Sequence, residues 1–113
     1  MASVFWFSKL KAGAEAQAYE RWVQQTDYRL AQEITCILHY RVHRIAGLVD
    51  GGGRPPFDYI EVLEVTDIDE YRSAMKDHPA IGQIVAEIGE FIVGAGSAWG
   101  EPIAPLGKER YMD

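Results

Sequence analysis

The distribution of apolar and polar residues along the chain predicts four strands. Residues 3–11 are apolar at both parities, with Val4 and Trp6 on one side and Phe5 and Phe7 on the other. This pattern is typical of a central strand that is covered on both faces. Segments rich in β-branched and aromatic residues indicate the others. These three strands are expected at residues 36–45, 58–65 and 91–99.

Two sets of side chains alternate in the second predicted strand, which places them on opposite faces of the sheet. One set is mainly apolar and is expected to pack on the helices: Cys36, Leu38, Tyr40 and Val42. The other set is expected to face away from the helices: Ile37, His39, Arg41 and His43. In the last strand, Gly94 and Gly96 predict a β-bulge or a close backbone approach.

Helical spacing of apolar residues predicts helices between the strands. Residues 14–25 form the first, and residues 26–35 either continue it or turn away. Thr66 and Asp69 have the spacing of a capping box and begin a second helix that ends near Met75. His78 precedes Pro79, which is a favoured first residue of a helix and begins the third one. Glycines and prolines predict a loop between the second and third strands, at residues 47–56.

The predicted order βαββααβ is that of an α+β, ferredoxin-like domain, in which the helices cover one face of a single antiparallel sheet. We expect one domain at residues 1–100 and a C-terminal arm at 101–113. The other sheet face is expected to carry four apolar side chains, and a second copy of the chain is expected to cover them in a dimeric α/β barrel. These side chains are Trp6, Ile37, Tyr59 and Leu63.

Composition and charge argue against several classes of function. The 113 residues carry a net charge of −6 without a basic run, which argues against a nucleic-acid partner. No apolar stretch is long enough for a membrane span, and no signal peptide is recognised, so a cytoplasmic location is expected. The single cysteine, Cys36, is expected to be inert packing and excludes a structural zinc site built on cysteines.

Polar residues on the predicted strands supply candidate chemistry. An imidazole can move a proton either way near neutral pH, and Glu61 is expected on the same side of the sheet as His39, away from the helices, so the two form a candidate catalytic acid and base. Arg41 is a candidate substrate contact that competes with a structural salt bridge to Glu61. His43 lies about 13 Å along the strand from His39, so the two cannot share a metal ion, and none is predicted.

Three aromatic residues, Trp6, Tyr59 and Trp99, are candidates for stacking on a flat heteroaromatic ligand, although aromatic side chains on buried strands more often form plain core. They are retained as candidate substrate-binding residues.

Three segments carry a resemblance to a known family: Tyr19-Glu20-Arg21-Trp22-Val23 with Asp27-Tyr28, the strand Tyr40-Arg41-Val42-His43-Arg44, and residues 57–65. In these the chain resembles the REDY-like (HapK-like) family of prodigiosin-type pigment biosynthesis, within the dimeric α/β-barrel superfamily. The resemblance implies that Asp27 borders the mouth of a cavity. It also implies a small enzyme of specialised metabolism that acts on indole- or pyrrole-derived intermediates in a condensation or cyclisation step.

The sequence thus leads to one hypothesis with two rivals. The leading one is an enzyme without a cofactor that binds a small planar heteroaromatic substrate inside the barrel and uses His39 and Glu61 as acid and base. The first rival is a cofactor-free monooxygenase of the same superfamily. The second is a carrier that shelters a reactive intermediate without converting it.

Overall fold

The computed structural model describes residues 1–108, and the expected arm therefore lies partly outside the described residues. No helix or strand occurs between residues 101 and 108. The elements are β1 (Ala2–Leu10), α1 (Ala16–Trp22), the π-helical turn η1 (Val23–Asp27), α2 (Tyr28–Ala31), β2 (Ile37–Arg44), β3 (Tyr59–Val65), α3 (Ile68–Asp77), α4 (Pro79–Ile88) and β4 (Ile92–Gly100).

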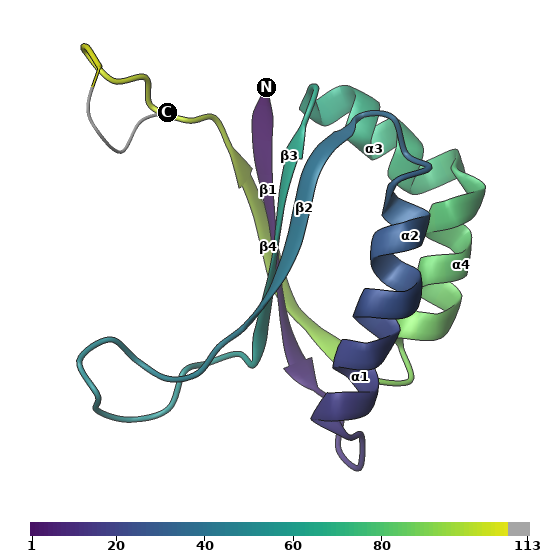
Figure 1. The fold of residues 1–113 in the computed structure, drawn as a ribbon, viewed down its shortest axis with the longest axis vertical. Coiled ribbons are helices and arrows are strands. Elements are labelled where there is room, and N and C mark those ends of the chain that lie inside the picture. Colours follow the sequence, from purple (N-terminus) through teal and green to yellow (C-terminus); the bar gives the residue numbers. More distant parts are fainter. Residues whose placement is uncertain (109–113) are drawn as a thin grey trace.

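The four strands form one antiparallel sheet in the order β2-β3-β1-β4, which confirms the predicted ferredoxin-like α+β fold. All helices cover the same face of the sheet (Figure 1). The β2–β3 connection and the segment after β4 both leave the sheet on the opposite side (Figure 1). No helix in the described part of the chain is long and apolar enough to span a membrane.

Irregularities interrupt both edge strands. The predicted irregularity in β4 is confirmed, because the β1–β4 register shifts where Gly96 pairs with Phe7 and Gly94 pairs with Ser8. A second, unpredicted shift occurs in β2, where Ile37 and His39 face consecutive residues of β3 and Leu38 is extra. Leu38 is therefore 55% exposed, and the expectation that it packs on the helices is wrong.

The helical segments settle one open alternative and differ from the expectation at one cap. Of the two alternatives for residues 26–35, continuation of the first helix is confirmed as far as Ala31, through η1 and α2. The N-cap of α3 is Asp67, whose side chain accepts a hydrogen bond from the Glu70 amide at 2.8 Å, one residue later than the predicted Thr66. At α4 the prediction is confirmed, since His78 caps the helix by accepting from the Ala80 amide.

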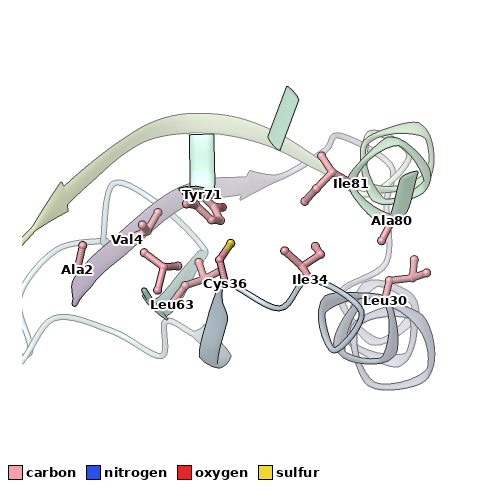
Figure 2. Close-up of a cluster of buried hydrophobic side chains, with 10 residues drawn as sticks. Ala2, Val4, Leu30, Ile34, Cys36, Leu63, Tyr71, Ala80 and Ile81 are labelled. Carbon is pink, nitrogen blue, oxygen red and sulfur yellow. The ribbon is translucent and has the colours of Figure 1, made fainter. Parts of the chain in front are cut away.

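The core lies between the sheet and the helices. One buried cluster joins β1 and β3 to α2, α3 and α4, with residues such as Val4, Leu63 and Ile81 (Figure 2). Cys36 is buried in this cluster, and its burial agrees with the expected packing role. A second cluster joins the α1–η1 region to Tyr59.

The alternation along β1 and β3 is as predicted, but the assignment of faces is wrong. Trp6, Ile37, Tyr59 and Leu63 belong to or pack against the core under the helices, not to the bare face. Because both parities of the strands are apolar, alternation shows which residues share a face without showing which face the helices cover. The bare face instead carries two partly exposed pairs of register partners, Phe5 with Val62 and Phe7 with Ile60.

Candidate active site between the sheet and the helices

A cavity of about 240 Å³ lies between the sheet and the helices. Apolar side chains from α3 and α4, such as Met75, Ile84 and Ile88, form much of its wall. Val85 and Gly94 also line it and are both exposed, so the cavity opens to solvent between α4 and β4. A concave, mainly apolar pocket with few polar groups is the usual form of a small-molecule site.

The π-helical turn positions Asp27 in this wall. The amide of Tyr28 donates to the carbonyl of Val23, five residues back, and this wider turn accommodates one more residue than an α-helical turn. Asp27 lies at its end and is only 1% exposed, because it faces the sheet. Single π-turns of this kind occur frequently at functional sites.

One tyrosine joins two carboxyl groups. The Tyr40 hydroxyl lies 2.5 Å from Oδ2 of Asp27 and 2.7 Å from Oε1 of Glu61. A tyrosine hydroxyl has one hydrogen to donate, so only one of these contacts can use it. The other contact needs a carboxylic acid proton, which the acid donates to the tyrosine oxygen. The geometry therefore favours a network, Asp27–Tyr40–Glu61, that holds one carboxylate and one protonated carboxyl group.

The electrostatics of this network agree with the geometry. Burial raises the pKa of Glu61 from its usual 4.5 to about 7, against the lowering effect of the hydrogen bond from Tyr40, and the nearby Asp27 contributes to the rise. Burial also raises the pKa of Asp27 from 3.8 to about 6. The pKa of Tyr40 is raised well above 10 by burial and by both carboxylates, so its hydroxyl stays protonated. Carboxyl groups whose pKa values approach neutrality are suited to proton transfer at physiological pH.

Two further hydroxyl groups belong to the cavity wall. Trp6 donates from Nε1 to the Tyr71 hydroxyl at 2.9 Å, and both residues line the cavity. Burial raises the pKa of Tyr71 to about 12, so it remains a hydrogen-bond donor. Ser8 also lines the cavity, and its buried Oγ has no hydrogen-bond partner among the described residues.

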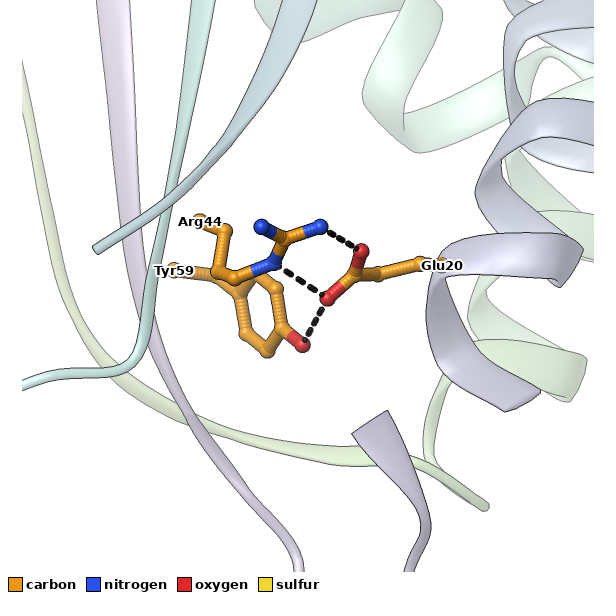
Figure 3. Close-up of polar contacts among 3 residues, drawn as sticks. All are labelled: Glu20, Arg44 and Tyr59. Carbon is orange, nitrogen blue, oxygen red and sulfur yellow. Dashed lines mark hydrogen bonds and ion pairs between the residues drawn. The ribbon is translucent and has the colours of Figure 1, made fainter. Parts of the chain in front are cut away.

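A second polar cluster ties α1 to the sheet (Figure 3). Arg44 donates from Nε to Glu20 at 2.8 Å and forms a second contact through its Nη2 atom. The Tyr59 hydroxyl donates to the same carboxylate at 2.9 Å. The hydrogen bonds from Arg44 lower the pKa of Glu20, which stays ionised. This cluster anchors the helix that presents Asp27.

The structure brings some predicted site residues together and separates others. Glu61, Asp27 and Trp6 all line the cavity. His39 does not share a face with Glu61: it pairs in register with Glu64, whose side chain binds Ser3 away from the helices. The predicted His39–Glu61 acid/base pair is therefore wrong, because the two strands direct these side chains to opposite faces.

The remaining candidates lie outside the cavity. Arg41 is exposed, donates to the Tyr40 carbonyl and lies 5.8 Å over the Tyr28 ring, so the alternative of a salt bridge to Glu61 is wrong as well. Trp99 is 44% exposed on the edge strand, against Arg72. Tyr59 is core and binds Glu20, and it does not line the cavity.

Sequence reasoning missed Tyr40, Tyr71 and Ser8. The sequence pattern places Tyr40 correctly on the helix-facing side but does not distinguish it from plain core. A phenol and a carboxylate at inward positions of adjacent strands require hydrogen-bond partners, but this signal appears only once Glu61 is known to face inward. Within residues 1–108, no cluster of three His, Cys, Asp or Glu side chains is arranged to hold a metal ion.

These features define a ferredoxin-like α+β domain with a cavity that holds carboxyl groups between its two layers. The model of the family "REDY-like protein HapK" matches residues 2–103, and the chain belongs to this family. HapK from Hahella chejuensis has a similar structure, with a TM-score of 0.78 and 22% identity over 96% of this chain and 99% of that one.

Two more distant structures share the fold. SnoaB, a cofactor-independent oxygenase from Streptomyces nogalater, has a TM-score of 0.67 and 11% identity over 95% of this chain and 97% of its own. A dimeric ferredoxin-like protein of unknown function from Thermobifida fusca has a TM-score of 0.63 and 17% identity, covering 88% and 86%. No curated protein matches the chain.

Proposed function

We propose that this protein is a small enzyme of specialised metabolism that acts without a cofactor. It binds an indole- or pyrrole-derived intermediate in the cavity and catalyses its cyclisation or condensation by proton transfer. The observation that carries the proposal is the Tyr40 hydroxyl, which joins two buried carboxyl groups in an otherwise apolar wall. Glu61 keeps its expected role as an acid or base, and Asp27 takes the place of His39.

The network suits the two proton transfers that such a reaction needs. When an electron-rich ring carbon attacks a carbonyl carbon, the carbonyl oxygen gains a proton and the ring carbon later loses one. The protonated carboxyl group of the network supplies the first proton, and the carboxylate accepts the second. Tyr40 passes a proton from one carboxyl group to the other, so the network ends each turnover with the number of protons it began with.

The apolar wall strengthens this chemistry. In a site of low dielectric constant, a carboxylate stabilises a neighbouring cationic ring intermediate more strongly than it would in water. The cavity of about 240 Å³ exceeds the 150 Å³ of an engineered cavity that holds benzene, so a fused two-ring molecule is a reasonable occupant.

Hydrogen–deuterium exchange at C3 of indole in D₂O tests the proposal without knowledge of the natural substrate. Exchange requires that an acid protonate the ring carbon and that a base remove a proton from it. We expect the protein to accelerate exchange, measured by ¹H NMR, and Glu61→Gln to lower the accelerated rate by about 10² to 10⁴ fold. Glu64→Gln is the matched control, since Glu64 lies on the same strand but contacts Ser3 on the other face.

Exchange no faster than in buffer, or a Glu61→Gln protein as active as the wild type, would contradict the acid/base role. The carrier hypothesis would then be favoured. The oxygenase hypothesis draws on the shared fold with SnoaB and is tested separately, by oxygen uptake with a phenolic substrate in an oxygen electrode.

We also propose that the enzyme is a homodimer. The bare sheet face is apolar where Phe5 pairs with Val62 and Phe7 with Ile60, and a relative of the same fold is described as dimeric. Light scattering at micromolar concentration should report about twice the mass of 12.7 kDa. Val62→Lys should give a monomer, and a wild-type protein that is already monomeric would refute this proposal.

A further inference from the structure

Two hydroxyl groups in the cavity wall have hydrogen-bonding capacity that the protein does not use. The Tyr71 oxygen accepts from Trp6, but no acceptor for its own hydrogen exists among residues 1–108. Ser8 is 3% exposed, and its Oγ has no partner in the same range. Buried polar groups are normally paired, so unpaired ones in the wall of an open cavity point to a ligand that completes them.

The charge of the wall restricts that ligand. The lining residues include Asp27 and Glu61 but, within the described part of the chain, no Lys, Arg or His. The nearby cations are committed elsewhere: Arg44 binds Glu20, and Arg41 is exposed and donates to a backbone carbonyl. An anionic ligand would therefore lose its hydration in the cavity without gaining a counter-charge.

The hydrogen bond from Trp6 also determines where the Tyr71 hydroxyl can donate its hydrogen. Because the Trp6 indole nitrogen donates to the phenol oxygen, it restricts the rotation of the hydroxyl hydrogen and leaves it free to bind an acceptor atom in the cavity. Trp6 lies on β1 directly opposite Glu61 of β3. A ligand oxygen bound by Tyr71 is thus held on the same stretch of the sheet as the carboxyl groups.

We propose that the cavity selects an uncharged aromatic molecule that carries a carbonyl oxygen, that Tyr71 donates the hydrogen bond to this oxygen, and that carboxylate analogues of the same ring are rejected. Tyr71 is then a specificity-determining residue. The inference uses the cavity of the proposed function and names the substrate class, but it concerns binding and does not need the protein to catalyse a reaction.

The indole N–H signals of the ¹⁵N-labelled protein provide the measurement. The chain has three tryptophans, so Trp6 is identified by Trp6→Phe, while Trp22, bound to Glu87, and Trp99, beside Arg72, report on regions outside the cavity. The probes share one ring: indole-3-carboxaldehyde, indole, and indole-3-carboxylate, which is ionised at pH 7.5. Each is titrated into the full chain, and its Kd is taken from the shift of the Trp6 signal.

We expect saturable shifts of the Trp6 signal with the aldehyde, binding about fivefold weaker for indole and at least tenfold weaker for the carboxylate. Tyr71→Phe should raise the Kd of the aldehyde about fivefold, which is the effect of one hydrogen bond, and should change the Kd of indole by less than about twofold. Glu61→Gln should reduce the discrimination against the carboxylate. If Tyr71→Phe does not fold, the comparison of aldehyde with indole in the wild type decides.

Three results would overturn the inference. The aldehyde and the carboxylate could bind with equal Kd, or Tyr71→Phe could weaken the binding of aldehyde and indole equally. The third is that the aldehyde leaves the Trp6 signal unshifted. The proposed function fails separately. If the aldehyde binds selectively while Glu61→Gln leaves indole exchange unchanged, the inferred binding specificity is supported and the proposed proton-transfer chemistry is refuted.

Discussion

The raised pKa of Glu61 makes the stability of the protein depend on pH in a specific direction. The carboxyl group has a pKa of 4.5 when exposed and about 7 in the folded protein. The folded state therefore binds more protons than the unfolded state between these values, and the free energy of unfolding falls as pH rises through this window. The neutral acid gives its full stabilisation below pH 4.5, and this is lost above pH 7.

The size of the effect follows from the shift. At 1.36 kcal/mol per pKa unit, the change from 4.5 to about 7 corresponds to about 3 kcal/mol. Glu61→Gln keeps the shape of the side chain and a partner for Tyr40, but it cannot ionise. We therefore expect the variant to gain about 3 kcal/mol relative to the wild type between pH 4 and pH 8.

Urea denaturation followed by far-UV circular dichroism at pH 4, 6 and 8 measures this difference at one fixed protein concentration. The pKa of Asp27 is raised in the same direction, and Asp27 contacts the same Tyr40 hydroxyl, so the comparison reports on the network as a whole. Glu64→Gln should show no such dependence. If the difference between Glu61→Gln and the wild type were the same at pH 4 and pH 8, the account of a buried, proton-holding network would be refuted.

Three other outcomes follow from the structure. Tyr19→Phe should leave the free energy of unfolding unchanged or raise it by up to about 1 kcal/mol in thermal denaturation, because its buried hydroxyl has no partner in residues 1–108; a clear loss would contradict this. Deletion of Gln24 should convert the π-turn to an α-helical one, keep the far-UV spectrum and lower indole exchange, because it removes the wider turn at whose end Asp27 lies; retained exchange would contradict the role of the turn. Gly96→Ala should cost about 1 kcal/mol or more in urea because Gly96 has a φ of +128°, whereas Gly94→Ala should cost less.

The sequence was sufficient for the fold because periodicity, glycine placement and the proline after His78 all agree with one topology. It was not sufficient to decide which strand residues face the helices. In β1 and β3 both parities are apolar, so Glu61 could be assigned to either side. In β2 the extra residue Leu38 interrupts the alternation, so residues before and after it follow different parities.

The candidate site was harder to predict than the fold. Asp27 lies in the cavity wall at the end of a π-turn, and the segment from residue 26 onward carries no pattern that requires this turn. Tyr40 has the position of a core residue, and only its contacts with two carboxyl groups distinguish it. Such contacts depend on three elements at once, which alternation within one element does not encode.

Strand β1 contributes side chains both to the cavity and to the bare face of the sheet, and this restricts the substitutions that it can accept. Trp6 and Ser8 line the cavity and Phe5 lies on the bare face, while Phe7 alternates with Trp6 but also borders the cavity, so a substitution along this strand disturbs at least one of the two surfaces. Val85 on α4 lines the cavity mouth and is exposed. In the proposed enzyme, substitutions in α4 change the cavity mouth without altering the bare sheet face, so a directed-evolution library would begin on this helix.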